Sequence, residues 1–199
     1  NTSEALVRVH AAGLNRADLL QRRGMYMPPP GFSPNIQGLE FAGEIVEIGS
    51  DVENLAAGDR VFGITAGEAQ AEYLTIDASL LALIPKALSF TEAAAVPEAF
   101  VTAHDAVITQ AGLRSGELLL IHAVGSGVGL AGLQIGKAFG ATVVGTSRSA
   151  EKLSRCIEFG LDLGIEFRSE TDPSAMIADR FEGRGADVIL DLVGAPYFE

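Results

Sequence analysis

Closely spaced glycines form the most informative local pattern in the sequence. Residues 120–129 read LIHAVGSGVG, so Gly127 and Gly129 follow an apolar run at alternate positions. Glycine lacks a Cβ, so its turns can be tight and a ligand phosphate can approach its backbone amides. Residues 127–132 also match G-x-G-x-x-G, although such a turn can serve only to pack a helix on a strand. The candidate phosphate-binding residues are Ser126, Gly127, Val128 and Gly129.

Basic and hydroxyl side chains follow the next apolar run, about 20 residues after the glycines. The stretch reads Thr-Ser-Arg-Ser at 146–149, with a lysine shortly beyond it. A site for NAD would place a carboxylate at the end of this strand to accept from the ribose hydroxyls. Cations and hydroxyls suit the 2′-phosphate of NADPH instead, and the alternative is a solvated basic turn. The sequence predicts that NADPH is bound by Ser147, Arg148, Ser149 and Lys152.

The elements that must position these residues follow a repeated order beyond residue 117. Apolar strand-like runs alternate with glycine turns and amphipathic helical segments, which is typical of a parallel sheet with right-handed crossovers. Strands are expected at 118–123, 142–146, 163–167 and 187–193, and helices at 128–139, 150–159 and 173–181. Dinucleotide-binding folds usually carry six strands, so two further strands with their helices are expected to be missing.

The first half of the chain has a different pattern of apolar residues. Short runs with alternating or β-branched residues predict strands at 5–9, 43–48, 60–62 and 72–76. Ser89 and Glu92 have the spacing of a capping box and predict the start of a helix, which Pro97 should break before a second helix at 100–108. The expected fold is α/β: an incomplete β-rich domain at 1–97 and an incomplete doubly wound domain at 98–199.

Composition excludes several classes of function. The chain has 26 Asp plus Glu against 14 Lys plus Arg, a formal net charge of −12, which disfavours nucleic acids and anionic lipids as partners. No apolar run reaches the roughly 18 residues of a membrane span. Cys156 is the only cysteine, so an intrachain disulfide is excluded and a reducing, cytoplasmic location is expected.

Several blocks together carry a resemblance over nearly the whole chain. They read AGLNRADLLQRRG at 12–24, GLEFAGE at 38–44, GDRV at 58–61, AAAVPEA at 93–99 and HAVGSGVG at 122–129. With these blocks in this order, the chain resembles the zinc-independent, zeta-crystallin-like quinone oxidoreductases of the medium-chain dehydrogenase/reductase superfamily. The resemblance implies a GroES-like catalytic domain, a Rossmann domain and an active site in the cleft between them. It also implies NADPH-dependent reduction of a small quinone or related electron-poor conjugated carbonyl, and a homodimer for the full-length protein.

The resemblance also assigns roles to individual residues. Zinc-dependent relatives place metal ligands at positions matching Asn15, Leu39 and about Glu98, and a leucine cannot bind a metal, so no metal is expected. Asn15 and Tyr26 match positions that line the cleft and are expected to donate hydrogen bonds to the reacting oxygen, and Thr102 and Gly194 match positions near the nicotinamide. The alternatives are a turn residue for Asn15, a loop aromatic for Tyr26 and a helix-bonded hydroxyl for Thr102.

Proteins with other functions would carry most of these residues. An enoyl reductase of the same superfamily would carry nearly the same pattern. A non-catalytic, crystallin-like protein that binds NADPH is a candidate from another class. Both reductases would bind the cofactor and transfer hydride, whereas the non-catalytic protein would bind the cofactor without turnover.

Overall fold

The computed structural model describes residues 1–168 and 170–194. By its internal contacts the chain divides into two compact units, residues 1–98 and 99–199, and the division falls inside one helix, α3 (Pro97–His104). In the described residues, no helix is long and apolar enough to cross a lipid bilayer.

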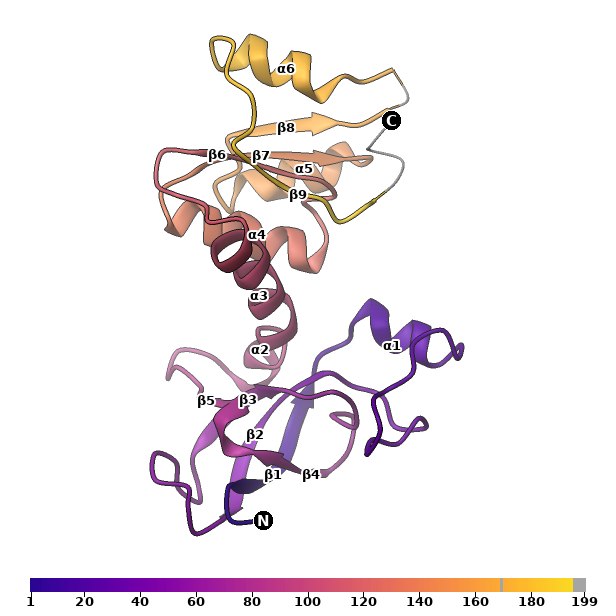
Figure 1. Cartoon of the computed structure of the whole chain (residues 1–199), viewed down its shortest axis with the longest axis vertical. Helices are drawn as coiled ribbons and strands as arrows, with labels where there is room; N and C mark the ends of the chain where they lie inside the picture. The colour runs from indigo at the N-terminus through magenta and orange to yellow at the C-terminus, as the bar shows by residue number, and fades with distance from the viewer. Residues whose placement is uncertain (169, 195–199) are drawn as a thin grey trace. The chain divides into compact units, whose positions relative to one another are not determined.

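Unit 1 is built on one antiparallel sheet (Figure 1). Its strands lie in the order β4-β1-β2-β3-β5. Their bounds are β1 Glu4–Ala12, β2 Glu40–Ile48, β3 Arg60–Ile64, β4 Tyr73–Asp77 and β5 Leu81–Leu83. The alternating pattern in the sequence identified the first four, whereas the three-residue β5 is too short to show a period.

Alternation along these strands creates the core of unit 1. Inward-facing side chains of β1, β2 and β3, including Val7, Phe41 and Val61, are fully buried together. Gly43 of β2 pairs with Val9 of β1. The strands approach closely there, and a Cβ at residue 43 would meet the backbone carbonyl of Arg8. The sheet therefore fixes the position of β2, whose first residue, Glu40, enters the candidate site described below.

Short helices flank this sheet. They are α1 (Arg16–Gln21), a 3₁₀ turn at Ala78–Leu80 and α2 (Phe90–Ala93). The predicted capping box is confirmed: Ser89 Oγ accepts from Glu92 N at 3.2 Å, and Glu92 Oε2 accepts from Ser89 N at 2.8 Å. Pro97 begins α3 instead of preceding a helix that starts at residue 100, because proline fits the first turn, where an amide has no helical partner.

Unit 2 contains a parallel sheet in the order β8-β7-β6-β9 (Figure 1). Its strands are β6 Leu118–Ile121, β7 Thr142–Ser147, β8 Leu163–Glu166 and β9 Val188–Leu190. The helices are α3, which continues into a π-helix at Asp105–Gln110, then α4 Gly127–Ala138, α5 Ala150–Ile157 and α6 Pro173–Arg180. The alternation of strands and helices thus predicted the parallel sheet correctly.

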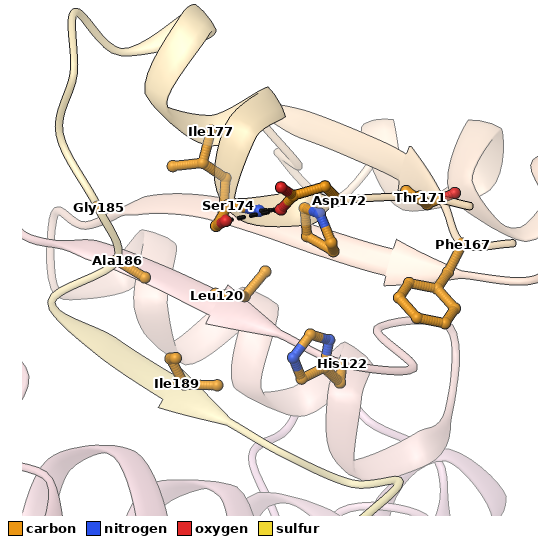
Figure 2. Close-up of a pocket in the computed structure, with 11 residues that line it drawn as sticks. Leu120, His122, Phe167, Thr171, Asp172, Ser174, Ile177, Gly185, Ala186 and Ile189 are labelled. Atoms are coloured by element: carbon orange, nitrogen blue, oxygen red, sulfur yellow. Dashed lines mark hydrogen bonds between the residues drawn. The ribbon is translucent and has the colours of Figure 1, made fainter. Parts of the chain in front are cut away.

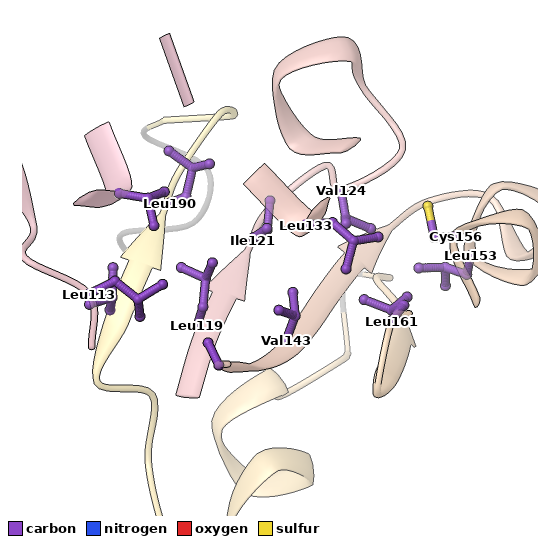
Figure 3. Packing of buried hydrophobic residues seen from close by; sticks show 13 residues of the cluster. Leu113, Leu119, Ile121, Val124, Leu133, Val143, Leu153, Cys156, Leu161 and Leu190 are labelled. Carbon is purple, nitrogen blue, oxygen red and sulfur yellow. The ribbon is translucent and has the colours of Figure 1, made fainter. Parts of the chain in front are cut away.

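Helices cover both faces of this sheet. One face packs against α4 and α5 through Leu119, Leu133 and Leu153 (Figure 3). The other face packs against α6 through Leu120, Ile165 and Ile177. The two faces explain why the strands read as nearly continuous apolar runs.

The last strand is shorter than the sequence indicated. It ends at Leu190 rather than residue 193, because Asp191 Oδ1 accepts from the amides of Val193 at 2.8 Å and Gly194 at 3.0 Å. These bonds close a turn directly after the strand. Gly194 has a φ of 86°, which favours glycine at that position.

Candidate functional site

The turns that follow β6, β7, β8 and β9 meet at the carboxyl edge of the parallel sheet. They surround a cavity of about 550 Å³. Strand order reverses between β6 and β9, and open parallel sheets bind their ligands at the carboxyl ends of strands beside such a reversal. The cavity is lined by Ala123, Gly125, Ser126, Ser147, Arg148, Ser149, Lys152, Phe167 and Val193.

The glycine-rich turn delivers the first helix terminus to this cavity. Ala123 adopts a left-handed conformation with φ of 54°, and Ser126 Oγ then caps α4 by accepting from Gly129 N at 3.2 Å. Within residues 1–168 and 170–194, the backbone amides of Gly127 and Val128 donate to no protein acceptor. These amides lie at the positive end of the α4 dipole, which is suited to a phosphate.

The two glycines of the turn meet different surroundings. A Cβ at Gly127 would have no atom within 4 Å, so its exposed backbone is open to a ligand. A Cβ at Gly129 would lie 2.6 Å from the carbonyl oxygen of Ala123 and 2.8 Å from Val124 Cα. The expectation that both glycines make room for a ligand is therefore revised: Gly129 is buried and lets α4 pack against the turn.

The basic turn after β7 supplies the opposite wall. Ser147 Oγ accepts from Ser149 N at 3.2 Å, and Ser149 Oγ caps α5 by accepting from Lys152 N at 3.3 Å. Both hydroxyls thus act as acceptors within the turn and retain an O–H that can donate to a ligand. The side chains of Arg148 and Lys152 are exposed.

The electrostatic character of this cavity contrasts with the acidic chain around it. Among the residues that the structure describes, its lining includes Arg148 and Lys152 and no carboxylate. Neither cation forms an ion pair in the part of the chain that the structure describes. Two unpaired cations, two hydroxyls and two unbonded amides form a donor set that fits a phosphate-bearing ligand.

Gly194, also predicted at this site, lies beside the cavity and is not part of its lining. Its neighbour Val193 does line it. The Gly194 amide already donates to Asp191, at 3.0 Å. Burial opposes ionisation of Asp191. The amides of Gly194 and Val193 and the nearby His122 outweigh this effect, so the pKa of Asp191 is lowered from its ordinary value.

A second cavity of about 540 Å³ lies beside α6 (Figure 2). Phe167 lines this cavity and the first one. Its lining, as far as the structure describes the chain, includes no Lys or Arg. Its carboxylate, Asp172, caps α6 by accepting from the amides of Ser174 at 2.9 Å and Ala175 at 3.1 Å. Burial lowers the pKa of His122, whose Nδ1 lies 3.0 Å from Thr146 Oγ1. This cavity is therefore less suited to an anion than the first.

Tyr26, predicted to contact the substrate, lines a cavity of about 420 Å³ in unit 1. Leu39 and Glu98 line it too, so two of the positions that match metal ligands in zinc-dependent relatives face the same space. The Tyr26 side chain is 43 % exposed, which leaves the phenol accessible. The cavity offers an apolar wall, one phenolic donor and one carboxyl group.

Asn15 is not part of that lining, and its side chain is already engaged. The Asn15 Nδ2 donates to Glu40 Oε1 at 2.7 Å, and its backbone amide donates to Asp18 Oδ2 at 2.6 Å. Thr102 is exposed on α3 in unit 2 and does not line the phosphate-suited cavity. The structure thus gathers most of the predicted cofactor residues around one cavity of unit 2, whereas in unit 1 Tyr26 lines a cavity whose lining does not include Asn15.

Sequence reasoning missed a carboxylate cluster around Asn15. Asp18 and Glu40 are buried, at 6 % and 3 % exposure, and Glu98 is half-buried. Burial raises the pKa values of Glu40 and Glu98, and each also feels the charge of Asp18. A glutamate at the start of a buried apolar strand was the only available signal. No group of three or more His, Cys, Asp or Glu in the described ranges is arranged to hold a metal ion.

Comparisons with known proteins match the two halves of the chain to two families. Residues 1–106 match the alcohol dehydrogenase GroES-like domain family, and residues 127–199 match the zinc-binding dehydrogenase family. A quinone oxidoreductase-like protein 2 homolog of Nematostella vectensis is 37 % identical over 200 residues, covering 100 % of this chain and 54 % of its own.

Solved structures agree. The Escherichia coli quinone oxidoreductase complexed with NADPH has a TM-score of 0.83 and 33 % identity, covering 98 % of this chain and 59 % of its own. The CurK enoyl reductase has a TM-score of 0.86 and 30 % identity, covering 98 % of this chain and 60 % of its own. The chain spans about half the length of the curated relatives such as the Nematostella protein.

Proposed function

Because the chain belongs to the zinc-independent, quinone oxidoreductase-like branch of the medium-chain dehydrogenase/reductase superfamily, we propose that it takes part in NADPH-dependent reduction of a quinone or related electron-poor conjugated carbonyl. The family supports oxidoreductase chemistry with a nicotinamide cofactor. The choice of NADPH and of the substrate class is the finer part of the proposal.

The observation that carries the proposal is the cation-lined cavity at the carboxyl edge of the parallel sheet. Within residues 1–168 and 170–194, Arg148 and Lys152 line it without a carboxylate, in a chain with a net charge of −12. A carboxylate that accepts from ribose hydroxyls would repel a 2′-phosphate, whereas these cations attract it. We therefore assign Ser147, Arg148, Ser149 and Lys152 to the 2′-phosphate of NADPH.

The remaining cofactor contacts are assigned to the glycine-rich turn. The amides of Gly127 and Val128 would hold the pyrophosphate, and Ser126 and Gly129 would shape the turn that presents them. Thr102 and Gly194 are proposed near the nicotinamide. When bound, the cofactor supplies the hydride, and the protein supplies position and electrostatics.

On the substrate side, the proposed contributions are hydrogen bonds. Negative charge develops on the carbonyl oxygen as a quinone or conjugated carbonyl accepts a hydride. The Tyr26 hydroxyl and the second Nδ2 hydrogen of Asn15 can each donate to that oxygen. A donor directed at a developing oxyanion stabilises the transition state more than the ground state.

No metal is assigned to this reaction. Leu39 offers no donor atom, and the Asn15 amide is held by Glu40. Elemental analysis of the purified protein should give no stoichiometric zinc. Zinc at one equivalent, removable by a chelator with loss of activity, would contradict this assignment.

Enoyl reduction is a second candidate because of the similarity to the CurK enoyl reductase. NADPH and NADH oxidation by the complete protein should be measured against a quinone panel and an α,β-unsaturated thioester. Faster turnover of quinones with NADPH supports the proposal, and faster turnover of the thioester favours the second candidate. Cofactor binding without turnover of either substrate would indicate a non-catalytic NADPH-binding protein.

Two further features belong to the proposal. A cytoplasmic location is consistent with a single cysteine, buried at Cys156. A homodimer is proposed for the complete protein by likeness to the family. Sedimentation at equilibrium tests it, and a monomer at micromolar concentration would contradict it.

A further inference from the structure

Glu40 is a buried carboxylate that joins two helix starts in unit 1. It lies at the beginning of β2 and is only 3 % exposed. Its Oε1 accepts from the Asn15 Nδ2 at 2.7 Å, and its Oε2 accepts from the Glu98 backbone amide at 2.8 Å. One side chain thus connects the residue before α1 with the first turn of α3.

The surroundings of Glu40 make an ionised group there costly. Burial raises the pKa of Glu40 and nearby Asp18 reinforces this effect, while hydrogen bonds from Glu98 and Asn15 oppose it. Gly13 packs directly against this carboxylate, so a Cβ at residue 13 would overlap the Glu40 side chain. An isosteric amide would avoid the cost of burying a charge, so the carboxylate calls for another explanation.

An ionised carboxylate has one property that an amide lacks, because both of its oxygens accept and neither donates. Facing it, the Asn15 side chain must present Nδ2 and not Oδ1. One Nδ2 hydrogen is then used by Glu40 and the other remains free to donate elsewhere. The chemistry of Glu40 therefore requires that the nitrogen of the Asn15 amide faces it.

We propose that Glu40 is a positioning residue that holds the Asn15 amide with its nitrogen available as a donor to the substrate oxygen. The catalytic consequence rests on the proposed function, whereas the orientation of the amide does not. Glu40 touches no substrate itself and acts through Asn15. The other titratable groups near it are Asp18, on α1, and Glu98, on α3.

Glu40→Gln is the decisive variant, because glutamine can satisfy the same partners in one way only. Its carbonyl oxygen accepts from the Glu98 amide, and its NH₂ then donates to Asn15, which must turn Oδ1 toward it. The fold is retained. The kcat for reduction of the substrate should fall about 10- to 100-fold, the effect expected when one hydrogen bond to a charged group is lost. The Kd for NADPH should stay within twofold of wild type.

Glu44→Gln provides the matched control. Glu44 lies on the same strand, and its side chain is 37 % exposed, where it faces Arg8. This control makes the same chemical change without touching Asn15, so kcat should be unchanged. A kcat loss of equal size in both variants would overturn the proposal, because strand β2 would then be sensitive to any loss of charge.

A spectroscopic readout separates orientation from catalysis. In ¹H–¹⁵N spectra, the Asn15 side-chain NH₂ pair should shift strongly in Glu40→Gln and stay in place in Glu44→Gln. An unshifted Asn15 pair in Glu40→Gln would overturn the proposal whatever the activity. A shifted pair with unchanged kcat would overturn the catalytic role of this orientation.

The pH profile gives a second, independent readout. Protonated Glu40 no longer forces the amide orientation, so the wild-type kcat should fall as the pH drops through the Glu40 titration. Glu40→Gln should lack that limb, whereas the neighbouring carboxyl groups of Asp18 and Glu98 are unchanged in both proteins. An identical acidic limb in both proteins would contradict the proposal. If wild type turns over no substrate, the proposed function fails, and the NMR measurement still decides whether Glu40 orients Asn15.

Discussion

The two units of this chain handle charge in opposite ways. Unit 1 withdraws the carboxylates of Asp18 and Glu40 from water and compensates them with neutral donors, the amides of Asn15, Gly38 and Glu98. Unit 2 leaves two cations exposed around a cavity whose described lining contains no carboxylate.

This difference shows what each arrangement is suited for. Buried charges with several hydrogen bonds fix local geometry, because removing any partner leaves an unsatisfied group. Exposed cations without partners keep their donors available for an anion, and such sites recruit phosphates efficiently. Unit 1 is therefore organised to orient side chains, and unit 2 to bind a ligand.

The largest effect should come from disturbing the helix start in unit 2. Gly129→Ala introduces a Cβ 2.6 Å from the Ala123 carbonyl and 2.8 Å from Val124 Cα, and backbone atoms cannot move aside cheaply. The free energy of unfolding should fall by about 3 kcal/mol, the upper part of the range for overpacked sites. Urea unfolding followed by circular dichroism measures this change.

Gly127→Ala is the matched control for that experiment. A Cβ at residue 127 meets no atom within 4 Å, so stability should stay near wild type while NADPH binding weakens. Equal losses of stability in the two variants would show that both glycines serve packing. Unchanged cofactor affinity for Gly127→Ala would remove the turn from the proposed site.

The next effect concerns the cations of unit 2. Arg148→Ala should weaken NADPH binding by about 10- to 150-fold, as expected for loss of one charge-assisted hydrogen bond. NADH lacks the 2′-phosphate and should bind almost as before. Arg148→Asp should lower the preference for NADPH over NADH further, because it places a negative carboxylate beside the negative 2′-phosphate. Isothermal titration with both cofactors measures the ratio.

Equal weakening of both cofactors would give Arg148 a structural role or a contact with the shared pyrophosphate. A wild-type preference for NADH would refute the interpretation of the whole basic turn. The fold and the family assignment would survive either result, because they rest on the sheets and the sequence similarity.

The sequence predicted what depends on local pattern. Alternation of strands and helices gave the parallel sheet, and local order placed the glycine turn and the Arg148 turn after neighbouring strands. It could not separate Gly127 from Gly129, because the two differ only in the atoms that surround them. The Glu40 network joins partners 25 and 58 positions apart in the chain, a contact that no local pattern encodes.

A smaller effect should appear in the pH dependence of stability. Because the pKa of Glu40 is raised above its ordinary value of 4.5, the folded protein holds more protons than the unfolded chain just above that pH. Its contribution to stability is therefore present at low pH and is lost as the pH rises through the folded pKa. In Glu40→Gln this loss is absent, so the variant should gain stability relative to wild type as the pH rises above 4.5 and through the folded pKa of Glu40.

Urea unfolding of both proteins across that range measures the difference. Carboxyls whose pKa values are lowered by hydrogen bonds, such as Asp77 and Glu92, act in the opposite direction. They are common to both proteins and cancel in the comparison. A difference that does not change with pH would mean that Glu40 titrates normally in the folded state.

The smallest effect should come from the exposed ion pair on the same strand. Arg8 and Glu44 approach to 3.4 Å with side chains 48 % and 37 % exposed, so water screens their attraction. Glu44→Gln should change the free energy of unfolding by about 0.5 kcal/mol or less, as measured for surface pairs. The change should disappear in 1 M NaCl, where the Debye length is roughly 3 Å. An effect above about 1 kcal/mol that persists in salt would show that Glu44, like Glu40, has a specific structural role, and β2 would no longer offer a buried and a surface carboxylate to compare.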